Sequence, residues 1–243
     1  MRSVLVVPCF NEAARLPVDE FREMVAVESG VSLVFVDDGS TDTTREVLTA
    51  LADRDGISLV ALDRNMGKAE AVRRGLIVAA SSGADWVGYV DADLATPRSE
   101  IARLLHIAES SPDHDCVFGS RVRLCGNQVT RKLSRHVSGR VFAGLADRVL
   151  GAHVYDTQAG AKFFRVSDRF TRCLAQPFAD RWAFDVELLG RLGRVGVFPD
   201  RTIEVPLRTW IDREGSKVSL VAGVRSVLSL WRIKRRLDRF VPT

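Results

Sequence analysis

The sequence of 243 residues has no tract rich in glycine, serine or proline, no low-complexity segment and no internal repeat. These absences remove the usual marks of a linker between domains. With 46% hydrophobic and 27% charged residues, the composition is that of an ordinary globular chain that can bury a sizeable core. We therefore expect one domain over residues 1–243, divided into 1–121, 122–217 and a basic amphipathic helix over 218–243.

Cysteine is sparse and no Cys-x-x-Cys pair occurs, so neither a zinc knuckle nor a disulfide scaffold is expected. No uncharged apolar stretch reaches the ~18 residues that a membrane span needs. The apolar run after Met1 and Arg2 is too short for the core of a signal peptide. These absences predict a cytoplasmic protein with reduced thiols.

Aromatic residues make up only 7% of the chain, and they are not interleaved with its basic end. Six lysines and arginines lie between Arg225 and Arg239, against the single acidic Asp238. Such a basic end suggests an anionic partner or surface. Because base-stacking aromatics are few, we expect no nucleic-acid partner.

Short apolar runs alternate with amphipathic stretches through the first half of the chain. We expect strands at 4–7, 33–36, 57–62, 86–90 and 116–119, with helices at 13–27, 43–52, 69–80 and 98–109 between them. This alternation predicts right-handed βαβ units, and so an α/β fold with a mainly parallel sheet flanked by helices. The second half is mixed, with helices at 129–150, 184–194 and 218–239 and strands at 161–165 and 201–207.

Two aspartates, Asp91 and Asp93, follow the apolar run 86–90, where a buried strand would end. Ligands and metals bind at such strand ends in α/β folds. Carboxylates at alternate positions can both reach a hard divalent cation, although a solvated acidic turn gives the same pattern. No Walker-type loop exists and no Gly-x-Gly-x-x-Gly follows the first apolar run, so neither a P-loop ATPase nor a dinucleotide oxidoreductase is favoured.

Five loops carry a resemblance to a known family. The runs VPCFNE (7–12), VDDGSTD (36–42), NMGK (65–68), VDAD (90–93) and GSR (119–121) resemble, in order, the donor-site motifs of glycosyltransferase family 2. In the second half, DTQAGAK (156–162), RWAFDVELL (181–189) and Trp210 with GSKV (215–218) resemble the polyprenyl-phosphate glycosyltransferases, most of all the dolichyl-phosphate β-glucosyltransferases.

The resemblance implies a GT-A fold, with nucleotide-sugar binding in 1–121 and acceptor binding in 122–217. It implies an inverting, Mg²⁺- or Mn²⁺-dependent transfer of a sugar, with glucose and uridine diphosphate expected, to a polyprenyl phosphate. The metal would lie on Asp91 and Asp93, and the uracil imide on Asp38. The expected donor-binding residues are Pro8, Asn11, Glu12, Asp38, Lys68, Asp91 and Ala92; the catalytic ones are Asp93, Arg121 and Asp185; the candidates for the acceptor phosphate are Arg121, Arg135, Lys162 and Lys217.

Three questions stay open at this level. Asp185 can serve as a general base for a hydroxyl acceptor, or it can orient a cation or bind sugar hydroxyls beside a phosphate acceptor. A non-catalytic protein that binds a nucleotide sugar or a membrane surface is an alternative of another class. The last helix has an apolar face that suits peripheral contact with the cytoplasmic membrane face or docking onto its own core; this face comprises Leu220, Val221, Val224, Val227, Leu228 and Trp231.

Overall fold

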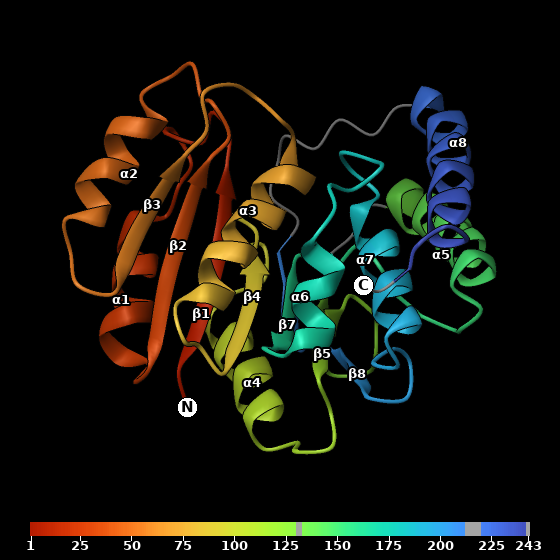
Figure 1. The fold of residues 1–243 in the computed structure, drawn as a ribbon. Helices are drawn as coiled ribbons and strands as arrows, with labels where there is room; N and C mark the ends of the chain where they lie inside the picture. The colour runs from red at the N-terminus through yellow and green to blue at the C-terminus, as the bar shows by residue number, and fades with distance from the viewer. Residues whose placement is uncertain (130–132, 212–219, 242–243) are drawn as a thin grey trace.

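The computed structural model describes residues 1–129, 133–211 and 220–241, without the side chains of 133–138 and 220–227. Within these residues a seven-stranded sheet has the order β3-β2-β1-β4-β7-β5-β8 (Figure 1). Its strands are β1 (Ser3–Cys9), β2 (Val31–Asp37), β3 (Ile57–Ala61), β4 (Trp86–Val90), β5 (Cys116–Ser120), β7 (Ala161–Arg165) and β8 (Thr202–Pro206). A separate two-stranded sheet joins β6 (Gln128–Val129) to β9 (Thr209–Trp210).

Helices cover both faces of the large sheet. They are α1 (Val18–Val27), α2 (Thr44–Ala52), α3 (Lys68–Ser81), α4 (Arg98–Glu109), α5 (Leu133–Leu150), α6 (Asp168–Leu174), α7 (Phe184–Arg194) and α8 (Leu220–Leu237). Figure 1 shows α3 and α6 across the near face of the sheet, with α5, α7 and α8 together at the β8 end. The prediction of an α/β fold with a mainly parallel sheet flanked by helices is confirmed.

The sheet is parallel except at one strand. β1 pairs in parallel with β2 and β4, whereas β7 runs antiparallel between β4 and β5. In β1, Leu5 and Val7 enter the core beneath α1, α2 and α4, and Val4 and Val6 enter the core beneath α3. Successive side chains of a strand point to opposite faces, and both faces are covered, so the strand is apolar throughout.

The expected start of the first helix and the expected end of the first strand differ from the structure. The helix expected from residue 13 begins at Val18, because residues 12–16 form a turn in which the Arg15 and Leu16 N–H groups donate to the Glu12 carbonyl at 2.9 Å. Pro17 then stands directly before the helix, where its missing N–H is tolerated. β1 runs through Pro8 to Cys9, since its pairing with β4 already stops at Val6.

In the second half, the helix expected from residue 129 begins at Leu133 within the described residues, and Val129 lies in β6. The short helix α6 was not expected; Ser167 caps it by accepting the N–H of Phe170. The last helix carries a third core cluster with α5 and α7, in which Leu230, Ile233 and Leu237 are buried. No described helix is both long enough and apolar enough to cross a membrane.

Candidate active site

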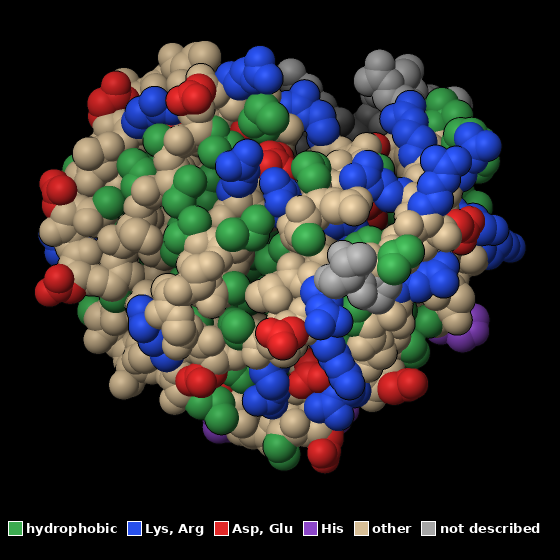
Figure 2. Space-filling model, viewed as in Figure 1, with side chains coloured by type: hydrophobic (Ala, Val, Ile, Leu, Met, Phe, Trp, Pro, Cys, Tyr) green, Lys and Arg blue, Asp and Glu red, His purple; other side chains and the backbone are tan. Residues whose placement is uncertain are grey.

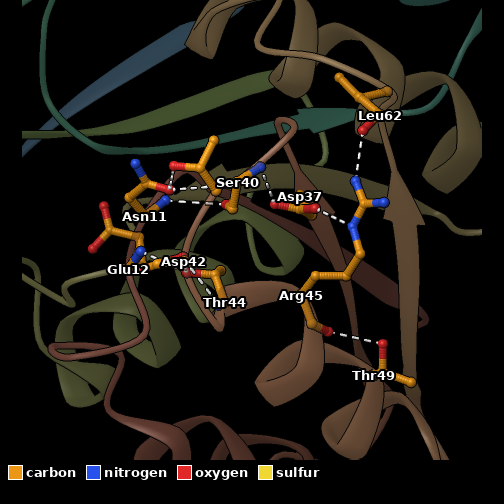
Figure 3. Close-up of polar contacts among 10 residues, drawn as sticks. Asn11, Glu12, Asp37, Ser40, Asp42, Thr44, Arg45, Thr49 and Leu62 are labelled. Atoms are coloured by element: carbon orange, nitrogen blue, oxygen red, sulfur yellow. Dashed lines mark hydrogen bonds and ion pairs between the residues drawn. The ribbon is translucent and has the colours of Figure 1, made fainter.

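The loops that follow β1 and β2 are tied together at the carboxyl edge of the sheet (Figure 3). The Asn11 amide oxygen accepts the N–H of Thr41 at 2.9 Å, and the Asn11 N–H donates to the hydroxyl of Ser40 at 3.1 Å. Asn11 has a φ of 55°, a left-handed conformation that asparagine tolerates better than most residues. The Glu12 N–H donates to the Thr44 hydroxyl at 2.8 Å. Asn11 therefore holds the loop after β1 against the loop after β2.

Asp38, directly after β2, is buried and faces the loop 65–68. Its two carboxylate oxygens accept the N–H groups of Met66 and Gly67 at 2.6 and 2.8 Å. Burial raises the pKa of Asp38, and these hydrogen bonds and the Arg181 guanidinium only partly oppose the rise. Asp38 does not cap the following helix, whose N-cap residue is Thr43. Asp38 therefore ties the loop after β2 to the loop 65–68.

The acidic pair after β4 lies beside Lys68, the first residue of α3. The Lys68 ammonium is 2.6 Å from an oxygen of Asp91. Burial lowers the pKa of Lys68, but the charges of Asp91 and Asp185 and the Asp91 hydrogen bond outweigh it, so the pKa is raised and the ammonium persists. Burial first, and the Asp91 charge second, raise the pKa of Asp93. The Ala92 side chain between them is in the hydrophobic core.

Gly160 has no side chain, and the Asp91 carboxylate occupies the space that a side chain there would fill. A Cβ placed at Gly160 would lie 1.8 Å from Oδ2 of Asp91, far closer than any van der Waals contact. The backbone also holds the two residues together, because the Asp91 N–H donates to the Gly160 carbonyl at 3.0 Å. The glycine of the DTQAGAK motif is therefore required for the position of the Asp91 carboxylate.

The acidic pair fits a hard divalent cation. Asp91 and Asp93 supply only oxygen atoms as ligands. Burial and then the negative charge of Asp91 raise the pKa of Asp93, and a bound cation would offset the repulsion between the two carboxylates. Among the described residues no group of three or more His, Cys, Asp or Glu side chains could hold a metal. Further ligands would have to come from water, from a hydroxyl such as that of Thr96, or from a bound molecule. Arg15, which sequence reasoning missed, pairs with Glu12. This hydrogen bond raises the pKa of Arg15, and the negative charges of Asp93 and Asp91 add to the rise.

Arg121, at the end of β5, is bound by a carboxylate in this structure. Its guanidinium donates to both oxygens of Asp156 at 2.6 and 2.8 Å and lies 5.3 Å from the ring centroid of Trp210. Burial lowers the pKa of Arg121, and the charge of and hydrogen bond to Asp156 outweigh it. Glu204 in turn accepts the Asp156 N–H at 2.7 Å. This network fixes Arg121 at the edge of the site.

Asp185, at the start of α7, lies over a fully buried cation. The Lys162 ammonium is 2.9 Å from Oδ1 of Asp185 and also donates to the Ala159 carbonyl at 2.5 Å. The Tyr89 hydroxyl donates to the same carboxylate oxygen. Burial, together with the charge of and hydrogen bond to Asp185, raises the pKa of Tyr89 well above its usual value, so the phenol stays protonated.

These placements change one expectation and leave two outside the described residues. Lys162 has no exposed surface, so it supports Asp185 from below instead of presenting its charge to an acceptor phosphate. The side chain of Arg135 and all of Lys217 lie outside the described residues. Sequence reasoning also missed Tyr89 and Arg181. The RWAFDVELL motif contains Arg181, but nothing in the sequence indicates which loop it contacts.

Ligands bind at the carboxyl edge of a parallel sheet in α/β folds, and here the loops at that edge bring paired carboxylates and a lysine together. The fold is that of GT-A glycosyltransferases. It is similar to glucosyl-3-phosphoglycerate synthase from Mycobacterium tuberculosis in complex with Mn²⁺, uridine diphosphate and glucosyl-3-phosphoglycerate, with a TM-score of 0.69 and 21% identity over 96% of this chain and 79% of the other. Mannosyl-3-phosphoglycerate synthase from Rubrobacter xylanophilus gives a TM-score of 0.70 and 20% identity over 98% and 74%.

The sequence model of Glycosyl transferase family 2 matches residues 4–169, and the chain belongs to this family. It is a glycosyltransferase. Dolichyl-phosphate beta-glucosyltransferase of Homo sapiens is 30% identical over 230 residues, covering 88% of this chain and 68% of the relative. The corresponding protein of Dictyostelium discoideum is 28% identical over 257 residues, covering 95% and 76%. The predicted family and fold are thus both confirmed.

Proposed function

We propose that this protein transfers glucose from uridine diphosphate glucose to a polyprenyl phosphate, with inversion at the anomeric carbon. The observation that carries the proposal is the Asp91, Asp93 and Lys68 cluster beside the Asp38 loop, because two carboxylates and an ammonium group lie together after the end of β4. The named acceptors of the similar proteins support the lipid phosphate. The neighbour that binds Mn²⁺ and uridine diphosphate supports the donor.

On the donor side, Asp38 would accept the imide N–H of uracil, and the loops of Pro8, Asn11 and Glu12 would enclose the base and ribose. Lys68 would bind the diphosphate that it approaches from the start of α3, where anions are favoured. Asp91 and Asp93 would hold Mg²⁺ or Mn²⁺, which neutralises charge on a leaving diphosphate. Each of these residues lies at the carboxyl edge, and Ala92 contributes only backbone there.

The reaction would be a single in-line displacement. An oxygen of the acceptor phosphate forms the new bond to the anomeric carbon as the bond from that carbon to the nucleotide diphosphate breaks, and the departing electron pair stays on the diphosphate. Negative charge then grows at the side where Lys68 lies, so this side chain stabilises the transition state. Asp93 would contribute as a metal ligand, and Arg121, held in place by Asp156, would face the acceptor phosphate.

The named acceptors of the similar proteins favour a phosphate over a hydroxyl acceptor. A general base must be free to accept a proton from the acceptor. Oδ1 of Asp185 is occupied by the Lys162 ammonium and the Tyr89 hydroxyl, so a hydroxyl acceptor would have to use Oδ2. A phosphate is ionised near neutral pH and needs positioning and charge neutralisation, not deprotonation. Asp185 would therefore act by holding Lys162 and Tyr89 under the acceptor.

Helix α8 docks onto its neighbours through residues outside the expected apolar face, and two residues of that expected face are exposed. Leu230, Ile233 and Leu237 dock onto α5 and α7, whereas Leu228 and Trp231 are 49% and 54% exposed. Figure 2 shows Lys and Arg side chains gathered over α8, next to hydrophobic ones. We include in the proposal a peripheral contact of this exposed face with the cytoplasmic membrane surface. Trp231→Ser should reduce co-sedimentation with anionic vesicles, and equal sedimentation of both proteins would refute the contact.

The transfer itself is tested by incubating purified protein with uridine diphosphate [¹⁴C]glucose, Mn²⁺ and a polyprenyl phosphate, then extracting with organic solvent. The proposal predicts label in the organic phase that is acid-labile and absent with Asp93→Ala. Label that appears only on water-soluble acceptors would instead favour the hydroxyl-acceptor enzyme. Nucleotide binding without turnover on any acceptor would favour the non-catalytic alternative.

A further inference from the structure

Arg181 is an exposed arginine from the second half of the chain that contacts the donor loop of the first half. Its Nε donates to the Met66 carbonyl at 3.1 Å, and its Nη2 donates to the Asn65 carbonyl at 3.1 Å and to the Asn65 side chain. The Arg181 carbonyl accepts the N–H of Ala69 at 3.3 Å. The guanidinium and the backbone of one residue therefore hold both ends of the loop 65–68.

The loop under Arg181 is shaped to receive it. Gly67 has a φ of 94°, and a Cβ there would lie 2.4 Å from Nε of Arg181. Only a residue without a side chain allows this approach. The same loop supplies the two N–H groups that bind Asp38 and begins the helix at Lys68. The loop 65–68, which Arg181 holds by hydrogen bonds, therefore determines the positions of both Asp38 and Lys68.

The residues on either side of Arg181 fix its backbone. Asp180 accepts the N–H groups of Trp182 and Ala183 at 2.9 and 2.7 Å, which closes the turn before α7. The hydroxyl of Ser229 in α8 donates to the other carboxylate oxygen of Asp180. Trp182 packs edge to face on Phe142 of α5, with ring centroids 5.6 Å apart. Because three helices hold its neighbours, Arg181 meets the loop from a fixed position.

We propose that Arg181 is a positioning residue for the nucleotide donor: it preorganises the loop 65–68 so that Asp38 and Lys68 are placed before the ligand arrives. The inference rests on the proposed donor site, in which these two residues bind the base and the diphosphate. Without Arg181, nucleotide binding would have to order this loop itself, and the cost would appear as weaker affinity. Folding should be little affected, since the side chain is on the surface.

The test is isothermal titration of uridine diphosphate with Mn²⁺ into wild type, Arg181→Ala and Arg181→Lys, without acceptor. Charge-assisted hydrogen bonds of this kind support an expected loss of roughly tenfold in affinity for Arg181→Ala. In turnover assays the loss should appear in KM for the donor, with kcat changed less. Arg181→Lys, which retains a donor and the charge, should recover part of the affinity.

Arg74→Ala is the matched control, because Arg74 is also an exposed arginine, in the middle of α3, bound to Glu70 at 2.7 Å. It should bind the nucleotide like wild type. If wild type binds uridine diphosphate and Arg181→Ala binds it equally well, the positioning role is overturned. If Arg181→Ala loses melting temperature in step with affinity and Arg181→Lys recovers neither, the residue is merely structural. If wild type does not bind the nucleotide, the proposed donor fails and the inference fails with it.

Discussion

The substitution Gly160→Ala should disable transfer through Asp91 while leaving the protein folded. The added Cβ would lie 1.8 Å from Oδ2, 2.4 Å from Cγ and 3.0 Å from Oδ1 of Asp91. Ordinary contact between such atoms needs about 3.5 Å, so the carboxylate must move by roughly 1–2 Å. That movement breaks the 2.6 Å contact with Lys68 and turns Asp91 away from the cation that we propose it shares with Asp93. Misplacement by about 1 Å costs on the order of 10²-fold in rate, and we predict a loss of this size in kcat/KM.

The assay is label transfer from the nucleotide sugar to the organic phase, measured beside thermal unfolding. Overpacking costs about 1–3 kcal/mol, so the melting temperature should fall by only a few degrees. Gly144→Ala is the matched control, because a Cβ at Gly144 in α5 meets nothing within 4 Å. The control should keep wild-type activity. Activity of Gly160→Ala within about threefold of wild type would refute the reasoning, since it would mean that the position of Asp91 does not matter.

Two further predictions concern ion pairs. Lys162→Met leaves the buried Asp185 without its cation, so the free energy of unfolding should fall by about 3–5 kcal/mol in denaturant titrations. Adding Asp185→Asn should recover much of that loss. Full additivity of the two changes would contradict a direct interaction between the side chains. Asp115 pairs with Arg201 and Arg165, and although burial raises the pKa of Asp115, these hydrogen bonds and charges outweigh it and lower the pKa. Because the folded pKa lies below the unfolded one, the ionised carboxylate stabilises the fold above pH ~4, and this stability is lost as the pH falls through the folded pKa. The stability difference between wild type and Asp115→Asn should therefore shrink on acidification; a difference that stays constant down to pH ~2 would contradict the assignment.

The sequence predicts the parallel part of the sheet well, because apolar runs buried on both faces end in polar loops. Every residue of β4 is buried, and the acidic pair follows it directly. The antiparallel insertion of β7 between β4 and β5 could not be predicted, since it depends on pairing between strands distant along the chain. α6 was missed because it has only seven residues, held by a Ser167 cap and by the stacking of Phe170 on Phe164.

The candidate site also contains some contacts that the sequence predicts and others that it does not. An anionic partner for Lys68 follows from its place at a helix start, and the structure supplies Asp91. The pairing of Lys162 with Asp185 does not follow from the sequence, because a lysine in a strand is normally expected at the surface. Arg181 could not be assigned either, since its partners Met66 and Asn65 lie 115 and 116 residues away in the sequence. The partners of Lys162 and Arg181 are determined by tertiary contacts and not by the local sequence pattern.

The central claim is that Asp91 and Asp93 hold a divalent cation against the diphosphate of the donor. Its most direct measurement is the affinity for uridine diphosphate by titration calorimetry with Mn²⁺ and with EDTA, for wild type, Asp93→Asn and the control Asp200→Asn, which alters an exposed carboxylate. The account predicts that Mn²⁺ tightens binding by at least roughly tenfold in wild type and in the control, and that Asp93→Asn loses this dependence. Affinity for wild type that is the same with and without Mn²⁺, or a dependence that survives in Asp93→Asn, would contradict it.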